Sequence, residues 1–117
     1  MIGMQVIVTI AQMLVRITGV LLLILGLLIW TENADNLIGI HTLLGLVLVL
    51  SMWVLAAVST RAGVSVGLAG GVAVGGLIVL VLGMTQRSLL PGSAHWVIQI
   101  AHLLVGMFAV GSAEAIN

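Results

Sequence analysis

Residues 4–30, MQVIVTIAQMLVRITGVLLLILGLLIW, form the apolar stretch that decides the fold class of this chain. Arg16 is its only charged residue, and a helix of this length crosses a hydrocarbon layer of about 30 Å with some tilt. The rest of the chain has the same character, because 62% of the 117 residues are hydrophobic and 5% are charged. This composition predicts an integral membrane protein.

Three further apolar segments follow, separated by short polar stretches. We expect helices over about 4–30, 34–60, 63–86 and 94–115, with Asn33 and Ser93 as N-cap residues. The connections TENADNL (31–37) and RSLLPGS (87–93) are short enough to force neighbouring helices to run antiparallel. The expected fold is therefore all-α: a single transmembrane domain, residues 1–117, built as an up-down-up-down four-helix bundle.

The charged residues limit the location and partners of the chain. The net charge is zero and lysine is absent, so we expect no nucleic-acid partner. Cysteine is also absent, which excludes disulfides, iron–sulfur clusters and thiolate metal sites. Arg16 and Arg61 fall on the side of the two termini, and Arg87 falls on the other. The positive-inside tendency then places both termini in the cytoplasm, with the bundle in a bacterial-type inner membrane.

Two five-residue stretches share a pattern, HTLLG (41–45) and HLLVG (102–106). Each has a glycine four residues after a histidine, hence one turn along the same helix face. An imidazole in an apolar helix is unfavourable unless a partner takes up its nitrogens. His41 and His102 lie eight and nine residues after the two expected N-caps. At 1.5 Å per residue, both should lie about 12–14 Å from the same membrane face.

Two imidazoles at one depth on different helices suit a planar cofactor with a central metal ion. Haem iron accepts histidine as an axial ligand. Gly45 and Gly106 would remove side-chain bulk where a porphyrin face would lie. The pattern therefore predicts one haem b, with iron held by His41 and His102 and with the two glycines beside the ring.

The outer end of the bundle carries further polar residues. Arg87 is expected to bind a haem propionate, because a guanidinium matches a carboxylate well. His95 lies seven residues before His102 on nearly the same helix face, so it could be a second propionate partner, an alternative ligand or a solvated residue at the interface. Two other interpretations stay open at this point. The histidines could be hydrogen-bonded interfacial residues without a ligand, or His41, His95 and His102 could hold zinc or copper.

Glycine recurs every four residues in the third segment, at Gly63, Gly67, Gly71 and Gly75. Such a ridge lets another helix approach closely. It predicts either the face of a homodimer or larger membrane complex, or close packing inside the same bundle.

Arg16 is the other polar residue that is costly in a membrane helix. It could pair with Glu114, which belongs to the same membrane side, or extend to the cytoplasmic interface. Arg16 could also bind an anionic head group or a partner subunit. Like Gln99, one turn before His102, it could instead bind a quinone.

The segments HTLLGLVLVL (41–50) and HLLVGMFAVG (102–111) resemble one half of bacterial haem A synthase, and they are similar to other four-helix membrane b-type cytochromes. The resemblance implies that His41 and His102 are an axial pair and that the haem lies in the outer leaflet. The catalytic half of that synthase has a glutamate one turn before the second-helix histidine, and Ile38 stands there in this chain. The resemblance therefore points to the half that holds haem b, and to an electron carrier rather than a catalyst.

The leading expectation is thus a membrane b-type cytochrome that transfers electrons or serves as the haem-bearing subunit of a larger complex. Its partners would be the lipid bilayer and a quinone or redox protein. The first alternative is a cofactor-free structural or assembly subunit that packs through the glycine ridge. The second is a quinone-linked oxidoreductase that uses Gln99 or Arg16 beside the haem.

Overall fold

The computed structural model describes residues 2–32, 35–61, 63–85 and 95–116. The helices are α1 (Ile2–Glu32), α2 (Ile38–Arg61), α3 (Val66–Thr85) and α4 (His95–Glu114), and a short 3-10 helix η1 (Asp35–Leu37) precedes α2. All regular structure in these ranges is helical, so the predicted all-α class with four long helices is confirmed.

Each of the four helices is long and apolar enough to cross a membrane. The candidate spans are Gly3–Thr31, Ile38–Arg61, Val66–Thr85 and Trp96–Glu114, with mean hydropathy between 1.7 and 2.4. Many large apolar side chains are exposed on the outside of the bundle, among them Leu43, Val66 and Phe108. An apolar exterior of this extent is what lipid tails require, and it indicates a multi-pass membrane protein.

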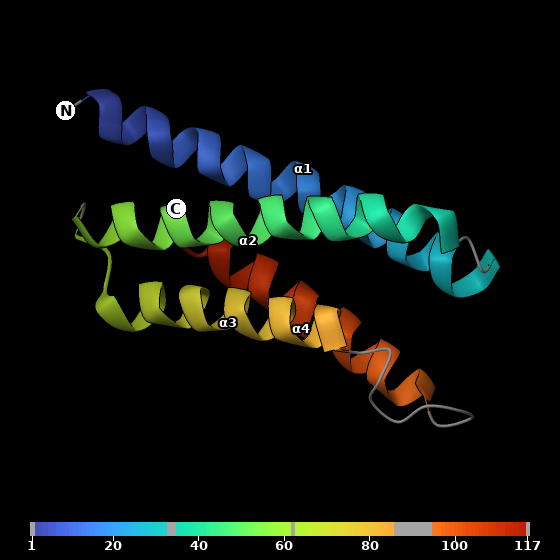
Figure 1. The fold of residues 1–117 in the computed structure, drawn as a ribbon. Helices are drawn as coiled ribbons and strands as arrows, with labels where there is room; N and C mark the ends of the chain where they lie inside the picture. The colour runs from blue at the N-terminus through green and yellow to red at the C-terminus, as the bar shows by residue number, and fades with distance from the viewer. Residues whose placement is uncertain (1, 33–34, 62, 86–94, 117) are drawn as a thin grey trace.

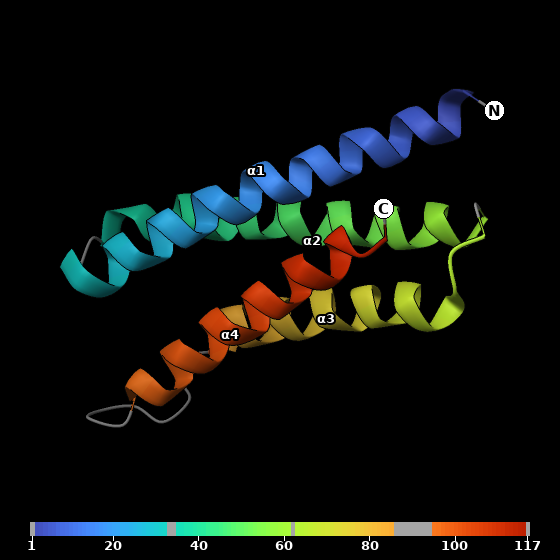
Figure 2. The ribbon, with the colours of Figure 1, turned by 180° about the vertical axis from the view of Figure 1, so that it is seen from behind.

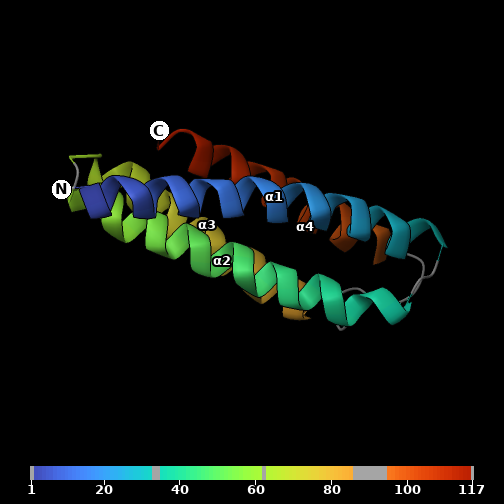
Figure 3. The same ribbon diagram turned by 90° about the horizontal axis from the view of Figure 1, so that it is seen from above.

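The chain runs along the long axis of the molecule four times, and consecutive helices point in opposite directions (Figure 1). α1 packs mainly against α2, α2 against α3, and α3 against α4, while α1 and α4 meet along a shorter seam. The view from behind shows α4 crossing in front of α3 at an angle (Figure 2), and the view from above shows α1 lying over the other helices (Figure 3). The molecule measures 51 × 24 × 16 Å.

The predicted bounds of the first two helices were wrong by a few residues. α1 begins at Ile2 and ends at Glu32, two residues beyond the apolar stretch on each side, because polar residues such as Thr31 are compatible with a helix end. α2 begins at Ile38 and not near residue 34, because η1 occupies residues 35–37. The proposed N-cap Asn33 lies outside the described residues.

The third helix begins three residues later than predicted because Gly63 belongs to the turn. Gly63 has a φ of +94°, a conformation that favours glycine. Its N–H donates to the Thr60 carbonyl, and the N–H of Val64 donates to the Ser59 carbonyl, the two hydrogen bonds of a Schellman motif that ends α2. Ser65 then caps α3, because its hydroxyl accepts a hydrogen bond from the Leu68 N–H at 3.2 Å.

α4 runs from His95 to Glu114, so it ends one residue before the predicted end, while the predicted start at residue 94 lies outside the described residues. Its expected N-cap, Ser93, lies outside the described residues.

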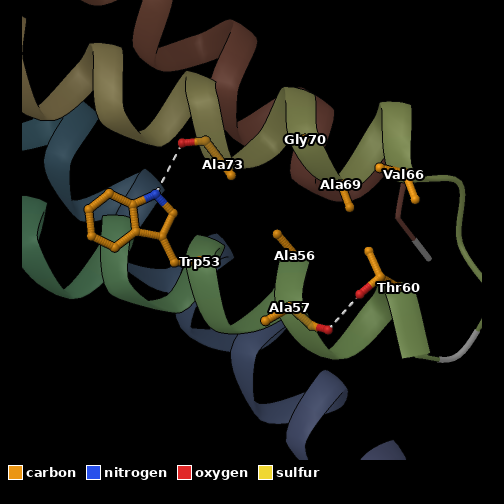
Figure 4. A pocket seen from close by; sticks show the side chains of 8 residues that line it. All are labelled: Trp53, Ala56, Ala57, Thr60, Val66, Ala69, Gly70 and Ala73. Carbon is orange, nitrogen blue, oxygen red and sulfur yellow. Dashed lines mark hydrogen bonds between the residues drawn. The ribbon is translucent and has the colours of Figure 1, made fainter.

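A tryptophan and a glycine hold α2 and α3 close together. The Trp53 indole N–H donates to the Ala73 carbonyl at 3.0 Å (Figure 4). A Cβ on Gly76 would lie 3.2 Å from Trp53 Nε1, closer than ordinary van der Waals contact, so the absence of a side chain at residue 76 gives the indole its room. Beside this contact the two helices leave a shallow groove of about 340 Å³, lined by Trp53, Ala56, Ala57, Thr60, Val66, Ala69, Gly70 and Ala73.

The glycine ridge of α3 divides into two parts. A Cβ on Gly75 would touch Cβ of Ala109 at 3.6 Å, so this glycine packs against α4. A Cβ on Gly63, Gly67 or Gly71 would meet nothing within 4 Å. Close packing inside the bundle therefore accounts for Gly75, while the other three leave room for a further helix.

Candidate functional site

The rings of His41 and His102 lie beside each other, although they come from α2 and α4. Their centroids are 6.3 Å apart, and the ring planes are tilted by 50°. His41 is only three residues into α2, whereas His102 is seven residues into α4. The rings nevertheless lie at the same level along the bundle. They form a close pair of half-buried imidazoles.

Each imidazole faces a glycine on a helix that carries no histidine. A Cβ on Gly26 of α1 would lie 3.5 Å from His41 Nε2. A Cβ on Gly83 of α3 would lie 3.2 Å from His102 Cε1, which is closer than ordinary van der Waals contact. All four helices therefore contribute to the site: α2 and α4 carry the rings, and α1 and α3 leave room for them.

His102 Nδ1 is a buried nitrogen of the histidine pair, and it has no hydrogen-bond partner among the described residues. A buried polar atom without a partner costs about 1–3 kcal/mol. Such an atom is common where a ligand or an ordered water completes the site.

The spacing of the rings can be compared with what a shared metal ion requires. An imidazole nitrogen binds a first-row metal ion at about 2 Å, which puts the ring centroid about 3 Å from the ion, so two opposed rings stand about 6 Å apart. The observed 6.3 Å agrees with this spacing. Two neutral imidazoles are also the donor set that haem iron accepts. The centroid distance is thus compatible with the predicted axial pair, which stays a prediction because His41 Nε2 faces Gly26 and no group of three or more metal ligands gathers among the described residues.

The two glycines of the HxxxG pattern do not touch the histidines of the other helix. A Cβ on Gly45 or on Gly106 would meet nothing within 4 Å, so open space lies beside both. Each is four residues after its histidine and therefore on the same helix face. Neither glycine is needed for close packing among the described residues. Their place beside a cofactor stays a prediction.

The predicted outer-end residues are described only in part. Arg87 lies outside the described residues. His95 is the first residue of α4, and the structure describes its backbone but not its side chain. Gln99 lies in α4 one turn before His102 and is half-buried. The roles assigned to these residues stay predictions.

A site for a bare metal ion needs more ligands than the pair supplies. Among the described residues, no group of three or more His, Cys, Asp or Glu side chains gathers in one place. Structural zinc sites have four protein ligands, and catalytic ones have three. Within the described part of the chain, the histidine pair alone does not form such a site.

A second polar group joins α1 to α4. Arg16 Nε donates to Glu114 Oε1 at 2.6 Å, and Arg16 Nη2 donates to Glu114 Oε2 at 2.9 Å. The expected pairing of these two residues is thus present, with both side chains about half-exposed. Gln12, one turn before Arg16, is buried, and its Nε2 has no hydrogen-bond partner among the described residues.

Gly26 and Gly83, against which the two histidine rings pack, were not predicted from the sequence. Gly26 lies six residues before the end of α1 at Glu32, and His41 lies six residues after Asp35, where η1 begins. Counting from both sides of this outer connection would have put them at one level. Gly83 is two residues from the end of α3 and could be found only with the tilt of α4 known.

The groove between α2 and α3 lies at the opposite end of the bundle from the histidines. Its only side-chain oxygen is the Thr60 hydroxyl, which donates to the Ala57 carbonyl at 2.8 Å (Figure 4). The groove therefore offers few polar groups that could orient a ligand.

Comparison of this chain with family models, with curated proteins and with solved structures finds no match.

Proposed function

We propose that this chain is a small b-type cytochrome that crosses the membrane as an up-down-up-down four-helix bundle. His41 and His102 would be the two axial ligands of one haem b. The observation that carries the proposal is the 6.3 Å spacing of the two rings, which come from different helices.

A haem is favoured over a bare metal ion by the number of protein ligands. Among the described side chains two imidazoles converge, and the porphyrin of a haem supplies the remaining four nitrogens itself. Gly45 and Gly106 have open space beside them, which leaves room for a flat group next to both ligand helices. The buried His102 Nδ1 without a partner also supports a ligand or water that completes the site.

A bound haem would supply reversible one-electron chemistry, and the protein would set where this happens. His41 and His102 would hold the iron in a fixed position. Gly26 and Gly83 lie against the two rings and have no side chains that would displace them. The apolar spans around the pair exclude water. Arg87 and His95, at the outer end, are the proposed partners of the propionates.

The location and partners follow from the same proposal. Both termini would be cytoplasmic in a bacterial-type inner membrane, and the haem would lie in the outer leaflet, as the resemblance to the haem b half of haem A synthase implies. Because Ile38 stands where the catalytic half has a glutamate, we propose an electron carrier, or the haem-bearing subunit of a larger complex. Its redox partner would be a membrane quinone or a redox protein.

Titration of the purified apo-protein with haemin in detergent tests the proposal. The expected result is saturation at one haem per chain, with a low-spin spectrum in both oxidation states. The His41→Ala/His102→Ala double variant is the matched control and should bind only weakly and without low-spin character. Equal binding by the wild type and the double variant would contradict the proposal.

The open part of the glycine ridge supports a second candidate function. Gly63, Gly67 and Gly71 have no neighbour within 4 Å of a Cβ, whereas Gly75 packs against Ala109. A helix of another copy, or of a partner subunit, could approach α3 closely there. The chain would then act as a cofactor-free structural or assembly subunit.

Self-association of labelled chains in vesicles, measured by energy transfer, tests this second candidate. Gly67→Leu and Gly71→Leu should abolish the energy transfer. Gly3→Leu, which also has nothing within 4 Å but lies on α1, should leave it unchanged. Unchanged energy transfer in all three variants would contradict a dimer face on α3.

A further inference from the structure

The ion pair between α1 and α4 lies well away from the histidines along both helices. Arg16 lies near the middle of α1, and Glu114 is the last residue of α4. α4 stops short of the end of the bundle that α1 and α2 reach, so the pair lies within the length of its neighbours (Figures 1 and 2). Among the described residues this is the only salt bridge.

The geometry of the pair fixes one helix against the other. The guanidinium binds the carboxylate through two nitrogens, at 2.6 and 2.9 Å, which is the bidentate arrangement. A slide of α4 by one residue moves Glu114 by about 1.5 Å along α1, so the fork keeps its two short hydrogen bonds only if both side chains change conformation.

The rest of the seam between α1 and α4 offers little resistance to sliding. A Cβ on Gly19 would lie 3.4 Å from Val110, an ordinary contact between small groups. On α4 the buried residue one position before the pair is Ala113, which has little bulk to interlock, while Ala109 packs against Gly75 of α3. The ion pair is therefore the directional contact of the α1–α4 seam, and it acts on the register of α4 together with the packing of α4 on α3.

The same register places the two histidines at one level. Gly26, which receives His41, lies ten residues beyond Arg16 on α1, or about 15 Å along the helix. His102 lies twelve residues before Glu114 on the antiparallel α4, or about 18 Å in the same direction. When the ion pair is closed, His102 thus lies within about one turn of Gly26, and so beside His41.

We infer that the Arg16–Glu114 pair is a positioning pair, which fixes the register of α4 on α1 and thereby the spacing of His41 and His102. The effect on a cofactor rests on the proposed function, but the effect on the helices does not. Neither residue touches the histidines, so the pair acts through the backbone of α1 and α4.

Cysteine crosslinking tests the register without any haem, because the chain has no native cysteine. The native register is reported by Gly19→Cys with Val110→Cys, which are in contact. A shift by one turn is reported by Gly19→Cys with Gly106→Cys. A third pair, His41→Cys with His102→Cys and a short bifunctional thiol reagent, reports the spacing of the site itself. Each pair is made in the wild-type background and in Glu114→Gln.

The inference expects Glu114→Gln to lower the Gly19–Val110 and His41–His102 crosslinks severalfold and to raise the Gly19–Gly106 crosslink. The exchanged pair Arg16→Glu/Glu114→Arg should restore the wild-type pattern. Arg61→Gln removes one charge from the exposed end of α2 and should change nothing. Identical crosslinking in the wild type and in Glu114→Gln would overturn the inference.

A haem-loaded measurement then links the pair to the site. The low-spin electron paramagnetic resonance signal and the midpoint potential should shift in Glu114→Gln, return in the exchanged pair and stay unchanged in Arg61→Gln. A changed crosslink pattern with an unchanged resonance signal and potential would overturn the link to the histidines. If the wild type binds no haem, the proposed function fails, while the His41–His102 crosslink still decides the inference.

Discussion

A Cβ on Gly83 would lie 3.2 Å from His102 Cε1, closer than ordinary van der Waals contact, so a side chain at residue 83 requires the imidazole to shift. Gly26 of α1 contacts His41 less closely, since a Cβ there would lie at an ordinary 3.5 Å from Nε2. The two helices without a histidine thus pack against the rings, and Gly83 makes the tighter contact.

Gly83→Val should displace the His102 ring, because two added methyl groups cannot fit where one carbon already lies too close. Groups that orient a metal ligand are worth about 10–100-fold in metal affinity, and we expect a loss of haem affinity of that order. Haemin titration of the purified variant measures it. Gly67→Val on the same helix is the control, since a Cβ there meets nothing within 4 Å. Equal losses in both variants would mean that helix propensity, and not the ring, is responsible.

His41→Ala and His102→Ala should each abolish six-coordinate, low-spin character, because one axial nitrogen is removed from the iron. The absorption spectrum of each variant, expressed with added haem, is the measurement. His95→Ala should cause a milder shift in spectrum or potential. Loss of haem in His95→Ala together with full retention in His102→Ala would show that the ligand was wrongly assigned.

Gly45→Leu and Gly106→Leu test whether a flat group lies beside the HxxxG faces. Both positions are open, so a leucine fits the apo-protein, and circular dichroism should show unchanged helix content. Haem binding should nevertheless fall by about tenfold or more, because the leucine occupies the space proposed for the porphyrin. Normal haem affinity in both variants would place the cofactor elsewhere.

Trp53→Phe should weaken the packing of α2 on α3. The variant loses the hydrogen bond from the indole to the Ala73 carbonyl, and hydrogen bonds between membrane helices contribute about 0.6 kcal/mol on average. Unfolding by sodium dodecyl sulfate, followed by circular dichroism, measures the change in free energy. Trp96→Phe is the matched control, because Trp96 is exposed at the start of α4. An equal effect of both substitutions would argue against the indole bond.

The sequence predicted the four helices because their apolar stretches are long and the connections between them are short. It placed the start of α3 at residue 63, since composition alone does not distinguish a helical glycine from one with a positive φ. The hydrogen bonds of Gly63 and Val64 to the end of α2 depend on backbone conformation, which the residue pattern does not report. Serine is a residue type that favours helix caps, so Ser65 could have been predicted as the N-cap of α3 from the sequence.

At the site, sequence reasoning found the residues with unusual chemistry and missed those that give them room. His41, His102, Arg16 and Glu114 are conspicuous because polar groups are rare in apolar helices. Counting from the two expected N-caps placed His41 and His102 at one depth, and a shared membrane side paired Arg16 with Glu114. The direction in which each ring points depends on helix rotation and tilt. Helix rotation and tilt depend on packing contacts, such as the contact of Trp53 with Gly76, which the spacing of residues in the sequence does not predict.

The most direct test of the account is the dithionite-reduced minus oxidised visible spectrum of the detergent-purified wild type from cells supplied with haem. Two histidines on one iron predict sharp α and β bands of a low-spin b haem, with one haem per chain. A colourless protein from the same cells would contradict the cytochrome proposal, as would a haem that stays high-spin in both oxidation states.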